Sequence, residues 1–339
     1  MERQRVRSRR DAFDIYSVQP LEIVENVGEL MTEAFNVLFS YSNPCQVGDV
    51  FYLVSRKGQG ASKRSFVRML DGIPELSSNH YSNGFVLTIV SQMTNTVRIE
   101  TQDKRATLGH PAQVWTRGLE RRLDLVRQHV DLEGKRMLEV GCGVGAFVRR
   151  LREFSEDVCG FDIDEENVRK ASHEVPGLGL AVGENLPFAD DTFDIVLLHE
   201  VLEHVTDDLE TLKETRRVLR SGGKAIVFTP NRMYPFETHG IFIGKRYVFG
   251  NIPFVNYLPD LVRNRLVPHA RVYTTRRLRR VYRKAGLKPL LHTYVFPGFD
   301  HIMAQRKIVG RVLRLLSYPF ENTPLRIFGL SHFVVLVKA

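Results

Sequence analysis

Residues 137–147 read Met-Leu-Glu-Val-Gly-Cys-Gly-Val-Gly-Ala-Phe, an apolar strand that runs into a loop with glycine at every second position. Glycine has no Cβ atom, so this loop can turn sharply and a ligand can approach its backbone closely. Asp162 stands 17 residues after the last of these glycines, at the end of a second apolar segment. Its carboxylate can accept hydrogen bonds from ribose hydroxyls. The pattern predicts a nucleoside pocket at the carboxyl ends of parallel strands.

The spacing of the glycines indicates which nucleoside is bound. Dinucleotide sites use G-x-G-x-x-G and place a pyrophosphate on a helix N-terminus. Here Gly141, Gly143 and Gly145 give G-x-G-x-G, with Glu139 before them. This arrangement resembles motif I of the class I S-adenosylmethionine-dependent methyltransferases, in which the acidic residue helps to order the loop around the methionine moiety.

Three further segments resemble motifs of this family and follow one another in the family's order. They are residues 182–188, 191–205 and 217–231. Together they are similar to the methyltransferase type 11 branch, which includes quinone-biosynthesis enzymes, closely over residues 112–235 and more loosely beyond. The resemblance implies S-adenosylmethionine as cofactor, with Glu184 where an aspartate usually takes the adenine amino group. The residues that it implies for cofactor binding are Glu139, Gly141, Cys142, Gly143, Gly145, Asp162, Ile163, Glu184, Asn185 and His199.

The alternation of apolar segments with helical ones predicts an α/β fold, a Rossmann-like doubly wound sheet of seven strands with helices on both faces. Five strands are expected near 136–140, 158–162, 179–182, 194–198 and 224–228. The last two are expected at 289–295 and 332–337, and the resemblance implies that they pair antiparallel. A helix with Trp115, Leu119, Leu123 and Val126 on one face should precede the first strand.

The chain divides into an N-terminal part without a recognisable motif and a C-terminal part that carries the motifs. Residues 1–92 show no motif and are expected to be either a poorly ordered extension or an artefact of the choice of start site, although 85–90 could form a strand. Residues 93–339 are expected to form the methyltransferase domain. Its cofactor-binding core would be 112–235, and an acceptor, lid and basic part would be 236–339.

Charge is concentrated at the C-terminal end. Residues 236–339 hold 18 basic and 4 acidic side chains, whereas the whole chain has a net charge of +9. Such an excess points to an anionic partner: membrane headgroups, a phosphorylated substrate or nucleic acid. Within this part, 241–258 suits an apolar lid and 274–286 a capped basic helix. Residues 302–318 pattern as a basic amphipathic helix, which either lies in a headgroup layer or covers the sheet between the last two strands.

S-adenosylmethionine is already activated, so methyl transfer mainly requires an acceptor lone pair or carbanion held in line with the methyl–sulfur bond. A base is needed only if the acceptor must lose a proton. Candidate catalytic residues follow the fourth and fifth strands and lie just beyond them, with Arg232 and Glu237 nearby. They are His199, Glu200, Asn231 and His239.

Glu200, Glu203 and His204 could share one helix face and bind a divalent cation through oxygen and imidazole. The string E-x-x-E-H resembles the metal motif of the O-methyltransferases of ubiquinone synthesis and of the small-RNA 2′-O-methyltransferases. His239 is then the nearest candidate for a further ligand. In the alternative reading, the glutamates serve helix polarity and the histidine packs on the sheet.

The leading hypothesis is methyl transfer to oxygen or carbon of a small, apolar or lipid-linked acceptor. RNA methylation and a non-catalytic membrane-associated scaffold are the alternatives. No apolar run approaches the ~20 residues that span a bilayer, and the three cysteines are scattered. The expected location is the cytoplasm, peripheral at an anionic membrane. The sequence leaves the oligomeric state open.

Overall fold

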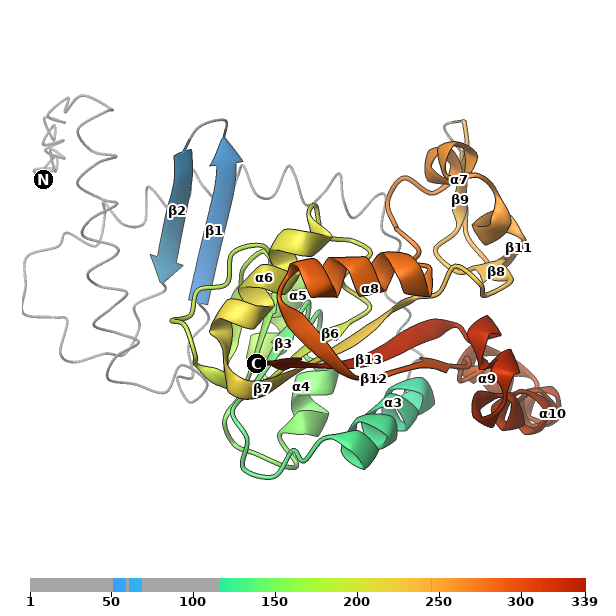
Figure 1. Cartoon of the computed structure of the whole chain (residues 1–339), viewed down its shortest axis with the longest axis horizontal. Helices are drawn as coiled ribbons and strands as arrows, with labels where there is room; N and C mark the ends of the chain where they lie inside the picture. The colour runs from blue at the N-terminus through green and yellow to red at the C-terminus, as the bar shows by residue number, and fades with distance from the viewer. Residues whose placement is uncertain (1–50, 59–60, 69–115, 245) are drawn as a thin grey trace, which may run out of the picture.

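The computed structural model describes residues 51–58, 61–68, 116–244 and 246–339 (Figure 1). Trp115 and the segment 85–90 lie outside these residues. In the described part of the chain, one nine-stranded sheet has the order β12-β13-β7-β6-β3-β4-β5-β1-β2. Its strands are β1 (Phe51–Gly58), β2 (Ala61–Arg68), β3 (Met137–Val140), β4 (Val158–Asp162), β5 (Leu178–Leu180), β6 (Phe193–His199), β7 (Leu219–Pro230), β12 (Leu287–Val295) and β13 (Ser331–Lys338).

Seven strands, from β12 to β5, form the predicted sheet. Strands β5, β4, β3, β6 and β7 are parallel. Strand β13 runs antiparallel to both β7 and β12, as expected for the last two strands. Strand β3 is fully buried because helices cover both faces of the sheet, which explains why its residues other than Glu139 are apolar. The Rossmann-like fold class is confirmed.

Strands β1 and β2 form a hairpin inside the segment for which the sequence showed no motif. The hairpin extends the sheet because β1 pairs in parallel with β5, at Phe51 opposite Gly179 and Tyr52 opposite Leu180. The division of the chain at residue 92 stays a prediction.

Five helices pack on the two faces of the sheet. Side chains of α3, α4 and α5 bury in one apolar cluster, and those of α6 and α8 in the other. Buried Leu123 and Val126 lie on α3, as the spacing predicted. These helices are α3 (Thr116–His129), α4 (Ala146–Leu151), α5 (Glu165–Ser172), α6 (Asp208–Val218) and α8 (Thr275–Lys284).

Helix α8 is the predicted capped helix. The Thr274 side chain accepts a hydrogen bond from the Arg277 backbone, and Leu278 and Tyr282 are buried. Its basic residues lie on the opposite, solvated face. The chain leaves the helix at Gly286, whose φ of 78° is in the left-handed region that glycine adopts without strain.

Two additions follow the fifth parallel strand. The first joins β7 to α8 and contains β8 (Phe236–Glu237), β9 (Ile241–Ile243), β10 (Arg246–Val248), β11 (Ile252–Pro253) and α7 (Asp260–Leu266). The second lies between β12 and β13 and contains α9 (Asp300–Gln305), α10 (Lys307–Ser317) and two 3-10 helices, 318–322 and 324–328. Both additions lie at the end of the molecule opposite the β1–β2 hairpin (Figure 1).

The amphipathic segment 302–318 is therefore two helices and not one. They meet at Arg306, whose φ of −139° and ψ of 80° end α9 and begin α10. The segment is an insertion between the last two strands, as one reading expected, but only Gly310 of α10 is buried. Among the described residues, no helix is both long and apolar enough to cross a membrane.

Candidate active site

The glycine loop follows β3 directly, and its backbone is left-handed at Gly141, Gly143 and Gly145, with φ of 75°, 53° and 70°. A Cβ atom at Gly141 would lie 2.2 Å from Cγ2 of Val201, so a side chain there would force Val201 to move. A Cβ atom at Gly143 would meet nothing within 4 Å. The loop thus packs tightly on one side and leaves open space above Gly143.

Two carboxylates order this loop. Buried Glu139 accepts a hydrogen bond from the backbone N–H of Val148 at 3.1 Å, which ties the strand to the first turn of α4. Burial raises the pKa of Glu139 well above its usual value. Asp162 accepts from the N–H groups of Gly143 at 2.7 Å and Asp164 at 2.8 Å.

Two oxygens of a carboxylate offer about four acceptor positions, and these two bonds leave room on Asp162 for a ribose hydroxyl. Burial raises the pKa of Asp162. Of the other residues in the expected cofactor set, Cys142 is buried and Ile163 is half-buried. The ribose contact itself stays a prediction.

The expected adenine contacts lie on the loop after β5. One oxygen of Glu184 already accepts from the backbone N–H groups of Thr206 at 2.7 Å and Asp207 at 3.0 Å. The side-chain nitrogen of Asn185 is buried and, among the described residues, has no hydrogen-bond partner. An unpaired buried donor is costly, so the Asn185 side chain is better suited to bind a ligand acceptor than the sequence suggested. Glu184 is less free to do so, because one of its oxygens already binds the turn before α6.

The segment after β6 is not the predicted helix. Residues 200–207 form a turn, and α6 begins only at Asp208. Asp207 caps that helix by accepting from the N–H groups of Leu209 and Glu210, each at 3.0 Å. Glu200 itself is left-handed, with φ of 55°. The idea that Glu200, Glu203 and His204 share one helix face is therefore wrong.

Glu200 bonds to Arg122 of α3 and to Ser331, and its carboxyl group also lies beside that of Glu203. Arg122, which is buried, donates to Glu200 at 2.5 Å, to Ser331 at 3.1 Å and to Nε2 of His199. Although burial raises it, the charge of Arg122 holds the pKa of Glu200 at about 2. Burial and the same guanidinium lower the pKa of His199 to about 3, which argues against His199 as a general base near neutral pH.

Asn231 serves as a structural clamp. Its side-chain nitrogen donates to the carbonyl oxygens of Ile327 and Gly329, each at 2.7 Å, and its oxygen accepts from Met233 at 3.1 Å. The residue is buried. These bonds fix the end of β7 against the C-terminal insertion and leave the amide with little capacity for an acceptor.

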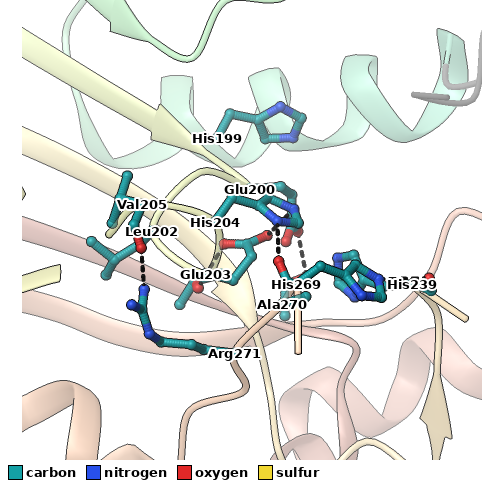
Figure 2. Close-up of polar contacts among 12 residues, drawn as sticks. His199, Glu200, Leu202, Glu203, His204, Val205, His239, His269, Ala270 and Arg271 are labelled. Atoms are coloured by element: carbon teal, nitrogen blue, oxygen red, sulfur yellow. Dashed lines mark hydrogen bonds and ion pairs between the residues drawn. The ribbon is translucent and has the colours of Figure 1, made fainter. Parts of the chain in front are cut away.

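A second polar cluster brings together Glu203, His204 and His239, whose ligand atoms all lie within 4.8 Å of one another (Figure 2). Glu203 comes from the turn after β6, and His239 from the segment between β8 and β9. A backbone hydrogen bond ties the Glu203 segment to the residues before α8: the N–H of Arg271 donates to the Glu203 carbonyl at 3.1 Å. The sequence named His239 as the nearest candidate for a further ligand; its ring lies beside Glu203 and His204, and its role as a metal ligand stays a prediction.

Hydrogen bonds orient both imidazoles. Nδ1 of His204 lies 3.0 Å from the carbonyl oxygen of His269, and Nδ1 of His239 lies 2.9 Å from the Glu237 carboxylate. Each Nδ1 therefore points its hydrogen toward an acceptor, and Nε2 is the ring nitrogen that this bond leaves unused. Nε2 of His204 is 4.0 Å from Oε1 of Glu203. Burial, followed by the nearby His239, lowers the pKa of His204 to about 4, so this ring is neutral near pH 7.

The cluster fits a divalent cation. Thr229 donates to one oxygen of buried Glu203 at 3.0 Å, and Oε1 of that carboxylate has no hydrogen-bond partner among the described residues. Burial, with the Glu200 charge, raises the pKa of Glu203 well above its usual value. One carboxylate oxygen and two imidazole nitrogens form a donor set that suits first-row divalent metals. Imidazoles held through their other nitrogen by a carboxylate or carbonyl are typical of such sites.

Several residues of the site gave no signal in the sequence. Arg263 is buried and donates to Glu237 at 2.7 Å and to the Ala270 carbonyl at 2.6 Å. Although burial raises it, hydrogen bonds from His239 and the Arg263 charge hold the pKa of Glu237 at about 2. Arg122 and His269 were missed for the same reason: they reach the site only through the tertiary fold, and no local motif marks them.

Residues 138–227 match the model of the methyltransferase domain family of type 11. A ubiquinone biosynthesis O-methyltransferase of Parvibaculum lavamentivorans is 34% identical over 127 residues, 36% of this chain and 50% of that protein. One from Coxiella burnetii is 31% identical over 138 residues, 39% of this chain and 58% of that protein. The chain thus spans about half the length of the curated relatives that it matches.

A crystal structure of an S-adenosylmethionine-dependent methyltransferase from Mesorhizobium loti aligns with a TM-score of 0.44 and 18% identity, over 67% of this chain and 98% of that one. The parallel sheet carries the glycine loop and Asp162 at the carboxyl ends of its strands, where ligands bind in open α/β sheets. Over residues 138–227, the chain is similar to the type 11 methyltransferase domain, and its curated relatives match over little more than a third of the chain.

Proposed function

We propose that this protein transfers a methyl group from S-adenosylmethionine to an oxygen of a small apolar or lipid-linked acceptor. The observation that carries the proposal is the pairing of a glycine loop closed by Asp162 with the cluster of Glu203, His204 and His239. Both follow parallel strands at their carboxyl ends, where ligands bind in open α/β sheets. The similarity to ubiquinone biosynthesis O-methyltransferases supports oxygen as the reacting atom.

The cofactor half of the site is built mainly from the backbone. The space above Gly143 leaves room for the methionine moiety, and Glu139 keeps the loop against α4. Asp162 is placed to accept from the ribose, and the unpaired Asn185 amide to donate to the adenine ring. Such fixed donors and acceptors hold the methyl donor in one orientation, which is the main contribution that an enzyme makes to this reaction.

In the acceptor half, Glu203, His204 and His239 would hold a divalent cation. When bound there, such a cation lowers the pKa of an acceptor hydroxyl and holds its oxygen. His239 is kept in place by Glu237, and His204 by the His269 carbonyl. Glu200 stays ionised because it is paired with Arg122, and this pair positions the turn after β6. His199 remains neutral beside the same guanidinium and takes no part in proton transfer.

The test is transfer of label from methyl-labelled S-adenosylmethionine into a lipid extract of the source cells by the purified full chain, followed by solvent partition. We expect label in the organic phase, bound through an ether that resists mild base. Label only in nuclease-sensitive material of a parallel whole extract would replace this proposal with RNA methylation. Failure to bind S-adenosylmethionine at all would favour a non-catalytic scaffold.

A further inference from the structure

Helix α10 exposes the apolar side chains that an amphipathic helix normally buries. Ile308, Leu315 and Leu316 are 76%, 74% and 62% exposed. Val309 and Val312 are also exposed and, by the helical period, lie on the same side as these residues. We call these five residues the α10 apolar face. A contiguous aliphatic surface of this kind marks an interaction site.

Basic side chains border this face. Neither Lys307 nor Arg311 has a hydrogen-bond or ion-pair partner of its side chain within the described part of the chain. The acidic residues of the insertion are neutralised internally, since Asp300 pairs with Arg314 at 3.0 Å and Glu321 pairs with Arg121. The cations next to the α10 apolar face therefore remain directed to an outside partner.

A groove of about 540 Å³ opens beside the same helix and combines guanidinium, aromatic and aliphatic groups. Its lining residues are Arg311, Arg314, Leu315, Tyr318, Pro319 and Asn322. Arg311 and Leu315 belong to both the helix surface and the groove, so one partner can engage an apolar chain and an anionic group together. A phospholipid has this combination of acyl chains and a charged phosphate.

The other addition also exposes large apolar groups. Leu261, Phe249 and Phe254 are 87%, 68% and 64% exposed. Phe254 adopts a left-handed backbone with φ of 64°, a conformation that is strained for an aromatic residue. Figure 1 shows β9, β11 and α7 at the same end of the molecule as α9 and α10. The two insertions that expose large apolar groups thus lie at one end of the molecule.

We propose that α10 is an interfacial helix that docks the protein on the surface of an anionic lipid bilayer. The α10 apolar face inserts among the upper acyl chains, and Lys307 and Arg311 lie at the level of the phosphates. Helices with exposed aliphatic side chains and bordering cations bind membranes in this way, and each cation adds to the attraction of anionic lipid. Docking itself does not depend on the proposed methyl transfer, although it would bring the site of His239 to a lipid-linked acceptor.

The experiment is flotation of the full chain with vesicles of phosphatidylcholine, with and without phosphatidylglycerol. We expect binding only to the vesicles that contain phosphatidylglycerol, and its loss in high salt. The double variant Ile308→Ser/Leu315→Ser should lose binding, and Lys307→Glu/Arg311→Glu should weaken it roughly tenfold or more.

Matched controls separate the α10 surface from general charge and hydrophobicity. Arg280→Glu/Arg283→Glu changes the same number of charges on the exposed face of α8, and Leu290→Ser removes an exposed leucine from β12. Both should float like the wild type. S-adenosylmethionine binding, measured on every variant by calorimetry, reports whether the fold is intact.

Three outcomes would overturn the proposal. Wild-type protein that stays unbound at every lipid composition would exclude membrane docking, whether or not it transfers methyl groups. Equal losses in the α8 control variant would mean non-specific charge attraction. Self-association in sedimentation that disappears with Ile308→Ser/Leu315→Ser, without any lipid binding, would assign the face to a second copy of the chain.

Discussion

The carboxylate of Glu237 lies 2.9 Å from Nδ1 of His239, and Arg263 holds that carboxylate from its other side at 2.7 Å. All three residues belong to the addition after β7, and Glu237 and Arg263 are buried. The pair fixes the His239 ring so that Nε2 is the nitrogen available beside Glu203 and His204. This is the arrangement that holds a metal-binding imidazole in proteins.

Removing His239 should strongly weaken cation binding. We expect His239→Ala to weaken Mn²⁺ or Zn²⁺ binding by about 100-fold or more, because one of three ligand groups is lost. Calorimetric titration of protein stripped with a chelator measures this. His173→Ala, which removes the exposed histidine at the C-cap of α5, is the matched control. Equal affinity of both variants would remove the cluster as a metal site.

Replacing Glu237 tests the supporting hydrogen bond alone. Glu237→Gln keeps an acceptor for His239 but loses the charge that faces Arg263. We expect cation affinity to fall by roughly 10- to 100-fold. S-adenosylmethionine affinity should remain unchanged, because Glu237 has no contact with the glycine loop. A parallel loss of both affinities would show a general folding defect and no specific role in orienting His239.

Asp162→Ala should weaken S-adenosylmethionine binding by about 1 to 3 kcal/mol. The change removes a ribose acceptor and leaves the N–H groups of Gly143 and Asp164 without their partner. Calorimetry gives the affinity, and Asp124→Ala, at an exposed position of α3, serves as control. Unchanged affinity in Asp162→Ala would contradict the assignment of the cofactor site.

Gly141→Ala should cost more stability than Gly222→Ala. Both glycines are left-handed, with φ of 75° and 77°, so both variants carry the same kind of backbone strain. Only at Gly141 would the new Cβ collide with Val201, at 2.2 Å, whereas Gly222 faces open space. Urea unfolding should show a further loss of about 1 to 3 kcal/mol for Gly141→Ala. Equal losses would mean that the loop and the turn 200–207 are not in contact.

Stability should fall in mild acid because of His332. Burial lowers the pKa of His332 to about 4, whereas an unfolded histidine titrates near 6.5. As the pH falls below 6.5, His332 becomes protonated in the unfolded chain. In the folded protein it stays neutral until the pH reaches about 4. The free energy of unfolding should therefore drop by about 2 kcal/mol between pH 7.5 and 5 from this group.

His332→Gln should remove that part of the pH dependence, whatever it costs at neutral pH. Urea unfolding at the two pH values gives the difference, and the exposed His173→Gln should leave it unchanged. An unchanged pH dependence in His332→Gln would show that His332 titrates normally in the folded protein.

The parallel core could be predicted from sequence because its signals are local. The strand before the glycine loop was expected at 136–140 and is found at Met137–Val140, since an apolar run followed by glycines leaves few alternatives. The helix after β6 could not be predicted from the spacing of Glu200, Glu203 and His204. There the Asp207 cap sets the start of α6, and the side chains before it project from a turn.

The acceptor half depends on contacts between residues distant in sequence. Arg122 reaches Glu200 from α3, 78 residues earlier in the chain. Arg263 reaches Glu237 across 26 residues. Such pairs satisfy buried charges, and a single sequence gives no indication of which cation meets which carboxylate. For the same reason, Asn231 was taken for a catalytic candidate although its amide is used by the backbone of the insertion.

Methyl transfer into the lipid extract, measured with and without a chelator for the wild type and for Glu203→Gln, tests the central claim most directly. We predict organic-phase label that the chelator abolishes and added Mn²⁺ or Zn²⁺ restores in the wild type. Glu203→Gln should bind S-adenosylmethionine normally and transfer no methyl group with either cation. Full transfer by Glu203→Gln, or by the wild type after chelation, would contradict a reaction at a cation held by Glu203, His204 and His239.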